Sequence, residues 1–308
     1  MNRGKRLKSG DTIGIVAPAS FADSDKLETA VTNLTNMGYQ VRLGKSSSNR
    51  WHSFAGDDQL RAGDINSFFE DDTIKAIICL RGGYGVLRLL DKLDYKIIAE
   101  HPKIFVGFSD ITLLHLVFNE KAKLITFHGP MLVSNFTSEI NYETKASFEQ
   151  AVGFGYQPYQ INNPPEYPFQ CLAGGKAEGV LIGGNLTTLL STFGTKYQPD
   201  LKDKILFIEE IKEATYRIDR ALTQLIHSRQ LQGLKGIILG NFNECNQSDP
   251  ADMSLEEVFQ DRLAGLGIPI IANLRSGHCE PLITLPLGAL IGIDADELKI
   301  KILEKVVD

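Results

Sequence analysis

The stretch IKAIICLRGGYGVLRLL, residues 74–90, places a continuous apolar run before a glycine-rich turn and a second apolar run. The first run, residues 74–80, is typical of a strand buried on both faces of a parallel sheet. The stretch IFVGFSDITLLHLVF, residues 104–118, repeats the pattern, with a strand expected over 104–108 and a helix over 111–118. Such repeats predict a doubly wound α/β sheet that binds ligands beyond the carboxyl ends of its strands.

The segments before and after these stretches continue the alternation. Apolar residues at helical spacing stop at Gly38, which fits a C-terminal helix cap, and a strand is expected directly after it. In the first 130 residues the pattern predicts further strands over 12–16, 39–43 and 124–127, and helices over 27–37, 60–69 and 86–93.

Residues 132–177 break this rhythm, because they hold several prolines and aromatic residues with little periodicity. A length of 308 residues allows about two domains at roughly 150 residues each. We therefore expect an N-terminal domain over 1–150, a linker over 151–175 and a C-terminal domain over 176–308. In the last of these, strands are expected over 179–182, 204–208, 236–239, 268–273, 282–285, 289–293 and 298–302, and helices over 186–193, over 216–231 and after Ser254, which has capping-box spacing to Glu257.

Charge and hydropathy exclude two classes of partner. The chain has 38 acidic residues against 32 Lys plus Arg, a net charge of −6, which argues against nucleic-acid binding because phosphate contacts need a basic surface. No apolar run approaches the roughly 18 residues of a membrane helix, and no signal-peptide core follows the basic start, so a cytoplasmic location is expected.

Metal and cofactor motifs are missing from the sequence. The four cysteines, Cys79, Cys171, Cys245 and Cys279, lie far apart without CxxC spacing, and no HxH or HxxxH pair occurs. There is no Walker loop, and residues 83–88 end in arginine where a dinucleotide fingerprint needs its third glycine. We therefore expect neither a metal nor a cofactor.

Two strand ends carry candidate chemistry. Ser109 stands in GFSD, residues 107–110, where a strand runs into a helix, a turn that can present a nucleophile, although Ile111 replaces the last glycine of G-x-S-x-G. The alternative is that Ser109 or Asp110 caps the helix. RGGYG, residues 81–85, could offer backbone N–H groups to an anion or oxyanion, or could be only a tight turn. Both loops should emerge at the same sheet edge.

Carboxylates and histidines complete the candidate set. Glu209 and Glu210 close an apolar strand, where Glu209 could orient a histidine, the alternative being solvated loop charges. Histidine is the usual general base, because its pKa lies near working pH. Of the six histidines, His128 and His278 lie in loops after strands, and position alone does not choose between them.

Taken together, these motifs resemble the LD-carboxypeptidase family of serine peptidases, which includes muramoyl-tetrapeptide carboxypeptidases and microcin C self-immunity peptidases. The resemblance spans almost the whole chain. Its ordered motifs are Gly10-Asp11 leading into IVAPAS at 15–20, RGGYG at 81–85, GFSD at 107–110, HGP at 128–130, GGNL at 183–186, IEE at 208–210 with YRIDR at 216–220, and Gly277-His278.

The resemblance implies a fold and a set of roles. The fold is a flavodoxin-like N-terminal domain joined to a C-terminal swivelling β/β/α domain. Ser109 would be the nucleophile, His278 the general base and Glu209 the acid that orients it. Backbone N–H groups of Gly83 and Asp110 would form the oxyanion hole, which needs preorganised donors.

The resemblance also implies a substrate, the murein tetrapeptide, whose terminal D-Ala is released by hydrolysis of an L,D bond during cell-wall recycling. Arg81 or the N–H groups at Gly82 are reasonable anchors for the substrate carboxylate. A microcin-type aminoacyl-nucleotide substrate, another acyl group cut by the same triad, and a non-catalytic two-domain binding protein stay open as alternatives. A homodimer is expected from the family.

Overall fold

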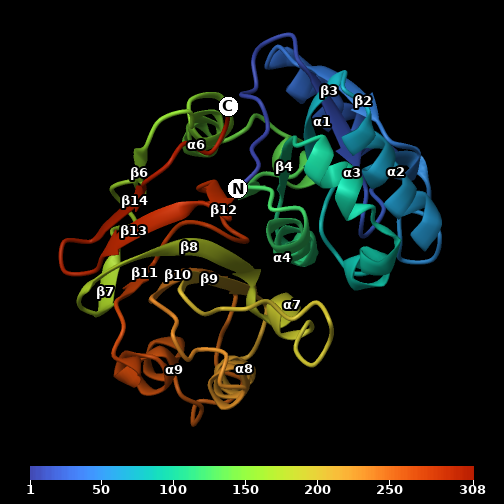
Figure 1. The fold of residues 1–308 in the computed structure, drawn as a ribbon. Helices are drawn as coiled ribbons and strands as arrows, with labels where there is room; N and C mark the ends of the chain where they lie inside the picture. The colour runs from blue at the N-terminus through green and yellow to red at the C-terminus, as the bar shows by residue number, and fades with distance from the viewer. The chain divides into compact units, whose positions relative to one another are not determined.

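The computed structural model describes residues 1–308, and the chain divides into two compact units (Figure 1). Unit 1 comprises residues 1–157, 284–288 and 305–308, and unit 2 comprises residues 158–283 and 289–304. Two units of mixed α/β structure confirm the expected fold class. None of the helices is both long and apolar enough to cross a bilayer.

Unit 1 is built on a sheet with the strand order β12-β5-β4-β3-β1-β2. The first five strands along the chain are parallel and follow the order 2-1-3-4-5, which is flavodoxin-like. Strand β12 pairs antiparallel with β5 at the end of the sheet. The strands are β1 (Thr12–Val16), β2 (Gln40–Leu43), β3 (Ile74–Cys79), β4 (Ile104–Gly107), β5 (Thr126–His128) and β12 (Leu285–Leu287).

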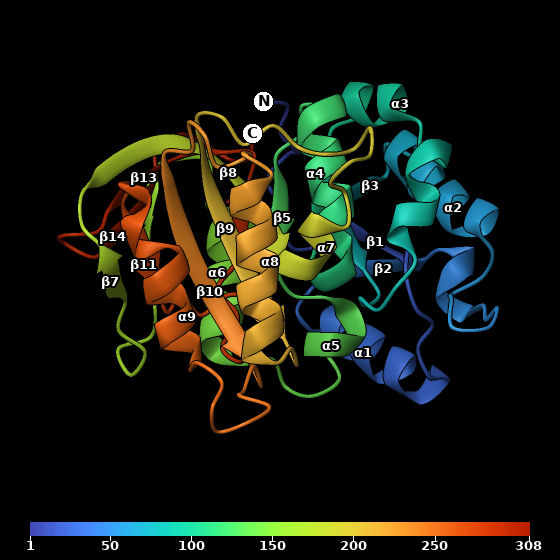
Figure 2. The same cartoon turned by 90° about the horizontal axis from the view of Figure 1, so that it is seen from below.

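Helices pack in two groups around this sheet. α1 packs against α5, as Figure 2 shows, while α2 packs against α3 and α3 against α4. The rings of Phe69, Phe105 and Phe118 contact one another in the core, at centroid distances of 5.0 to 6.2 Å. The helices are α1 (Ser24–Asn36), α2 (Asp58–Glu70), α3 (Tyr95–Glu100), α4 (Thr112–Lys121), α5 (Leu132–Asn135) and α6 (Tyr142–Gly153), with 3₁₀ turns η1 (Lys45–Ser48), η2 (Val86–Lys92) and η3 (Ser109–Ile111).

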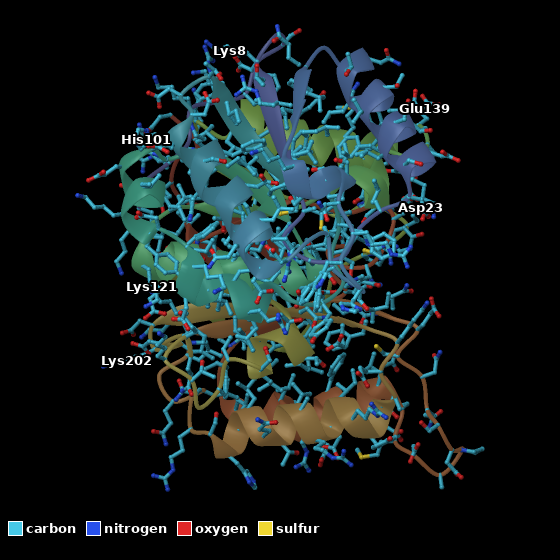
Figure 3. The ribbon with its side chains drawn as sticks, turned by 90° about the vertical axis from the view of Figure 1, so that its right-hand side faces the viewer. Lys8, Asp23, His101, Lys121, Glu139 and Lys202 are labelled. Atoms are coloured by element: carbon cyan, nitrogen blue, oxygen red, sulfur yellow. The ribbon has the colours of Figure 1, made fainter.

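Charged side chains occupy the margin of unit 1. Lys8, Lys121 and Glu139 are exposed and lie at its periphery (Figure 3), whereas the inner strands β1, β3 and β4 are almost wholly buried. This distribution explains the continuous apolar runs of the sequence, because strands covered by helices on both faces need no polar alternation.

Unit 2 contains an eight-stranded mixed sheet with the order β6-β14-β13-β8-β9-β10-β11-β7. Strands β8 to β11 are parallel, and β13, β14, β6 and β7 join them antiparallel. Helices α8 and α9 pack together over one face (Figure 2). The strands are β6 (Tyr159–Ile161), β7 (Gln170–Ala173), β8 (Lys176–Asn185), β9 (Lys204–Ile211), β10 (Gly236–Asn243), β11 (Ile270–Ala272), β13 (Leu290–Asp294) and β14 (Lys299–Ile302).

The helices of unit 2 start where local chemistry favours them. Ser254 and Glu257 form the predicted capping box, each side chain accepting from the backbone N–H of the other. Helix α8 buries one stripe, including Ile218, Leu222 and Leu225. The helices are α7 (Leu186–Leu190), α8 (Thr215–His227), α9 (Leu255–Arg262) and the 3₁₀ turn η4 (Ala264–Leu266).

Two segments differ from the sequence expectation. Residues 151–175, expected as a linker, hold the end of α6 and strands β6 and β7, the two edges of the unit 2 sheet. Short edge strands tolerate nearby prolines, because one side of the strand donates to no neighbour. Strand β12 belongs to unit 1 although its residues lie late in the chain. No local pattern encodes pairing with a strand so distant in sequence.

Candidate active site

Ser109 stands at a strained strand-to-helix turn. It follows β4, and its backbone has φ = +66°, a left-handed value that is costly for a residue other than glycine. No side chain caps the N-terminus of η3 or α4, so the helix-cap alternative for Ser109 and Asp110 is wrong. Strain of this kind is typical of nucleophile turns, where it thrusts the hydroxyl out of the helix.

The glycine loop, residues 81–85, packs directly against this turn. A Cβ atom built on Gly82 would lie 2.7 Å from Cβ of Ser109, so only glycine allows this approach. Gly83 has φ = +129°, and its N–H and that of Gly82 donate to no group within the chain. Unused N–H groups beside a strained serine are suited to bind an oxyanion or a carboxylate.

Behind the glycine loop lies a buried arginine that sequence analysis missed. Arg61 on α2 is fully buried, and its guanidinium donates to the carbonyl oxygens of Pro18 (2.5 Å), Gly56 (3.1 Å) and Gly85 (3.3 Å). It is also paired with Asp58 at 2.6 Å. No sequence signal could have found it, since arginines on helices are mostly exposed.

The side chain of Asp110 makes a contact of its own, in addition to the backbone N–H that is predicted to bind the oxyanion. Its Oδ2 accepts a hydrogen bond from the N–H of Val86 at 2.9 Å. Burial raises the pKa of this carboxyl to about 6, opposed by the backbone N–H groups of Val86 and Gly85 and by the charge of Arg61. The nucleophile turn and the glycine loop are therefore joined by a side-chain hydrogen bond.

Two histidines of unit 1, His115 and His128, are buried. His115 on α4 donates from Nε2 to the carbonyl of Gly107 at 2.8 Å, and burial lowers its pKa to about 4, so it is neutral. His128 on β5 is fully buried, with its ring 5.8 Å from that of Phe108.

In unit 2 a carboxylate and an imidazole are paired. Oε2 of Glu209 lies 2.7 Å from Nδ1 of His278, although the two residues are 69 positions apart. Glu209 is fully buried and His278 is 17% exposed at its side chain. Burial raises the pKa of Glu209, while the hydrogen bond from His278 opposes that shift. A carboxylate that accepts from Nδ1–H leaves Nε2 of the ring available as a base.

The neighbouring Glu210 performs a different task. Strand β9 extends to Ile211, beyond the expected end at residue 208, so both glutamates lie inside the strand and the solvated-charge alternative is wrong. Glu210 accepts from Asn185 (2.7 Å) and from the N–H of Thr187 (2.9 Å) at the start of α7. Strand alternation thus gives one glutamate to the histidine and the other to a helix.

Gly277 provides a test of the pair. Its φ is +121°, and a Cβ built on it would lie 2.7 Å from Oε2 of Glu209. We expect Gly277→Ala to displace the carboxylate from His278 and to lower kcat about 10- to 100-fold, measured by steady-state kinetics. Gly265→Ala, where nothing lies within 4 Å, is the control. An unchanged kcat in Gly277→Ala would show that the pair does not need this geometry.

The predicted site residues thus fall into two groups. Unit 1 brings together Gly82, Gly83, Ser109 and Asp110, and unit 2 brings together Glu209 and His278. Arg81 is exposed; its guanidinium lies 3.5 Å from the carbonyl of Phe21 and forms no ion pair. No group of three or more His, Cys, Asp or Glu side chains is placed to hold a metal ion.

Comparison with known proteins gives matches over both units. Residues 13–129 match the model of the LD-carboxypeptidase N-terminal domain, and residues 178–293 match that of the LD-carboxypeptidase C-terminal domain. The chain is 40% identical over 296 residues to the probable murein peptide carboxypeptidase of Bacillus subtilis, covering 95% of this chain and 92% of that protein.

Solved structures of similar proteins have the same fold. A muramoyltetrapeptide carboxypeptidase from Oxalobacter formigenes matches with a TM-score of 0.83 and 30% identity, covering 94% of this chain and 97% of its own. The microcin-immunity protein MccF in complex with glutamyl sulfamoyl guanosine matches with a TM-score of 0.92 and 27% identity, covering 99% of both chains.

Proposed function

The chain belongs to the LD-carboxypeptidase family and is a serine-type peptidase, and on that premise we propose that it hydrolyses the L,D bond that releases the terminal D-Ala of murein tetrapeptide. The observation that carries the proposal is the buried Glu209–His278 pair at 2.7 Å, which has the chemistry of a general base held by a carboxylate. The similarity to murein peptide carboxypeptidases supports the choice of substrate.

The proposed mechanism gives each predicted site residue one role. Ser109 Oγ attacks the scissile carbonyl carbon while Nε2 of His278 takes the hydroxyl proton, and Glu209 stabilises the imidazolium that forms. N–H groups of Gly83 and Asp110 stabilise the oxyanion. The imidazolium then protonates the departing D-Ala nitrogen, leaving an acyl-enzyme. Water, deprotonated by His278, attacks that ester and restores the Ser109 hydroxyl.

The proposed substrate is acidic, and two exposed arginines that contact Phe21 offer cations to meet it. Arg81 and Arg50 both contact Phe21, Arg81 at the carbonyl (3.5 Å) and Arg50 over the ring (4.1 Å from its centroid). Neither forms an ion pair, although the chain carries a net charge of −6. We therefore place a substrate carboxylate at Arg81 and the N–H of Gly82.

Removal of Arg81 should weaken substrate binding more than catalysis. We expect Arg81→Ala to raise KM about 10-fold with kcat within about 3-fold, because a charge-assisted hydrogen bond is lost while the reacting groups stay in place. Steady-state kinetics on murein tetrapeptide measure both constants. Lys75→Ala, on the same strand as the residues leading to Arg81, is a control expected to change neither. A lower kcat at unchanged KM would contradict this role.

Product analysis by mass spectrometry tests the reaction itself. We expect murein tetrapeptide to lose one D-Ala, and we expect an L,L-linked analogue to remain intact. Equal rates on the two peptides would show that the same triad serves a less selective amidase or esterase. Location in the cytoplasm, a role in cell-wall recycling and a homodimer remain predictions for this chain.

A second candidate substrate is an aminoacyl-nucleotide analogue of the microcin type. One similar structure holds glutamyl sulfamoyl guanosine, and this chain has an exposed tryptophan, Trp51, whose ring lies 5.8 Å from that of Phe54 and could stack with a base. Incubation with an aminoacyl sulfamoyl adenosine separates the two candidates. Release of the amino acid at a rate above that of D-Ala release would favour the microcin-type activity.

A further inference from the structure

The mechanism above uses only the backbone N–H of Asp110, yet its side chain is tied to the glycine loop. Oδ2 of Asp110 accepts from the N–H of Val86 at 2.9 Å, and the N–H of Gly85 adds a weaker interaction with the same carboxylate. Asp110, the residue after the nucleophile, therefore holds the Gly85–Val86 end of the glycine loop.

A second anchor holds the same end of the loop. Arg61 donates to the carbonyl of Gly85, so the Gly85–Val86 segment is bound on its N–H side by Asp110 and on its carbonyl side by Arg61. Arg61 also attracts the Asp110 carboxylate electrostatically, which offsets part of the cost of burying that charge. Asp58 in turn pairs with Arg61 at 2.6 Å and with Arg88 at 2.9 Å.

The other end of the loop, at Gly82 and Gly83, is held by packing rather than by hydrogen bonds. Gly82 packs against Cβ of Ser109, and the space beside Gly83 is filled by Ser20, whose Oγ would lie 2.2 Å from a Cβ built there. The position of the Gly83 N–H relative to Ser109 thus depends on contact at one end of the loop and on hydrogen bonds at the other.

We propose that the Asp110 side chain is a positioning group, which locks the glycine loop to the nucleophile turn and so sets the spacing between the two N–H donors of the oxyanion hole. This inference rests on the proposed function, because the two N–H donors stabilise an oxyanion only if the protein catalyses acyl transfer. Preorganised donors matter steeply: a displacement of about 1 Å can cost about 100-fold in rate, and loss of one donor costs 10²- to 10³-fold.

Two variants of Asp110 test the proposal, and both retain its backbone N–H. We expect Asp110→Asn, which keeps one acceptor oxygen, to lower kcat about 10-fold and Asp110→Ala about 100-fold, with KM within about 3-fold. A boronic acid analogue of the tetrapeptide mimics the tetrahedral intermediate, so its inhibition constant should rise by the same factors while substrate KM does not.

The matched control is Asp64→Asn. Asp64 is a buried aspartate on α2 that accepts hydrogen bonds from the backbone N–H and the hydroxyl of Ser46 rather than from the glycine loop. Loss of the Asp64 carboxylate should lower the melting temperature but leave kcat and the boronate inhibition constant within about 2-fold of wild type. If Asp64→Asn and Asp110→Asn lose kcat to the same extent, the effect at Asp110 is explained by lower stability of the fold. That result would overturn the proposal.

The pH profile gives a second, independent readout. The carboxylate form of Asp110 accepts the loop N–H groups, and its pKa is raised to about 6 by burial, so the loop is held above that pH and loosened below it. Arg61 is the charged group facing it from α2, with Asp58 and Arg88 behind. In wild type, kcat should fall more steeply below pH 6 than in Asp110→Asn, which has no carboxyl to protonate at this position.

These outcomes separate this proposal from the function on which it rests. If Ser109→Ala is inactive while Asp110→Ala keeps the wild-type kcat, boronate affinity and pH profile, the positioning role is wrong and the serine mechanism stands. If Ser109→Ala retains activity, the proposed function itself is wrong.

Discussion

Ser109→Ala should lower kcat for murein tetrapeptide by three to six orders of magnitude. Without the hydroxyl no acyl-enzyme forms, and the residual rate is what the oxyanion donors and substrate binding still supply. Ser109 has the strained φ of +66° and lies beside a loop in which the N–H groups of Gly82 and Gly83 donate to no group in the chain. Release of D-Ala, followed by mass spectrometry, measures the effect.

A matched serine shows that the loss is specific. Ser67→Ala removes a hydroxyl from α2 in the same unit, where it donates to the carbonyl of Asp64, and should leave kcat unchanged. Turnover by Ser109→Ala within a few-fold of wild type would contradict a serine nucleophile. It would also favour the alternative of a non-catalytic binding protein, in which the glycine loop only binds an anion.

His278→Ala should have the second largest effect, a loss of kcat of about three to six orders of magnitude. Serine is a poor nucleophile at neutral pH unless a base removes its proton, and His278 is the histidine paired with a buried carboxylate, at 2.7 Å. Glu209→Gln should cost somewhat less, because an amide can hold the ring but cannot stabilise the imidazolium. Single-turnover kinetics would place both losses in the acylation step.

His128→Ala is the informative comparison for the general base. His128 is fully buried on β5, so its removal should leave a cavity and lower stability, with a much smaller effect on kcat. Melting temperatures measured beside kcat separate the two effects. The assignment of the base to His278 fails if His128→Ala alone abolishes turnover in a protein that remains folded.

The order of elements was predictable because each depends on neighbours in the chain. Buried strands such as β3 and β4 appear as continuous apolar runs, and the capping box at Ser254 is complete within four residues. Edge strands β6 and β7 were missed, because short exposed strands with nearby prolines carry neither a continuous nor an alternating apolar pattern.

The candidate site was predictable only in part. Ser109 and the glycine loop follow strands of one parallel sheet, so topology alone brings them to one edge. The motif order of the family singled out Glu209 and His278. Nothing in the sequence indicated that Arg61 would be buried behind the loop, or that the Asp110 carboxylate would hold it, since both contacts join residues 24 positions apart through side chains.

The sequence by itself determined an α/β chain with a doubly wound first sheet, and a serine and a glycine loop at that sheet's carboxyl edge, whereas the flavodoxin-like fold was implied by the resemblance to the family. Local periodicity and turn chemistry suffice for these, because they act between residues close in the chain. Only the tertiary structure decided that β12 pairs with β5 at the edge of the first sheet, and that Asp110 and Arg61 hold the glycine loop. Each of these depends on register and burial, which form only when distant segments pack together.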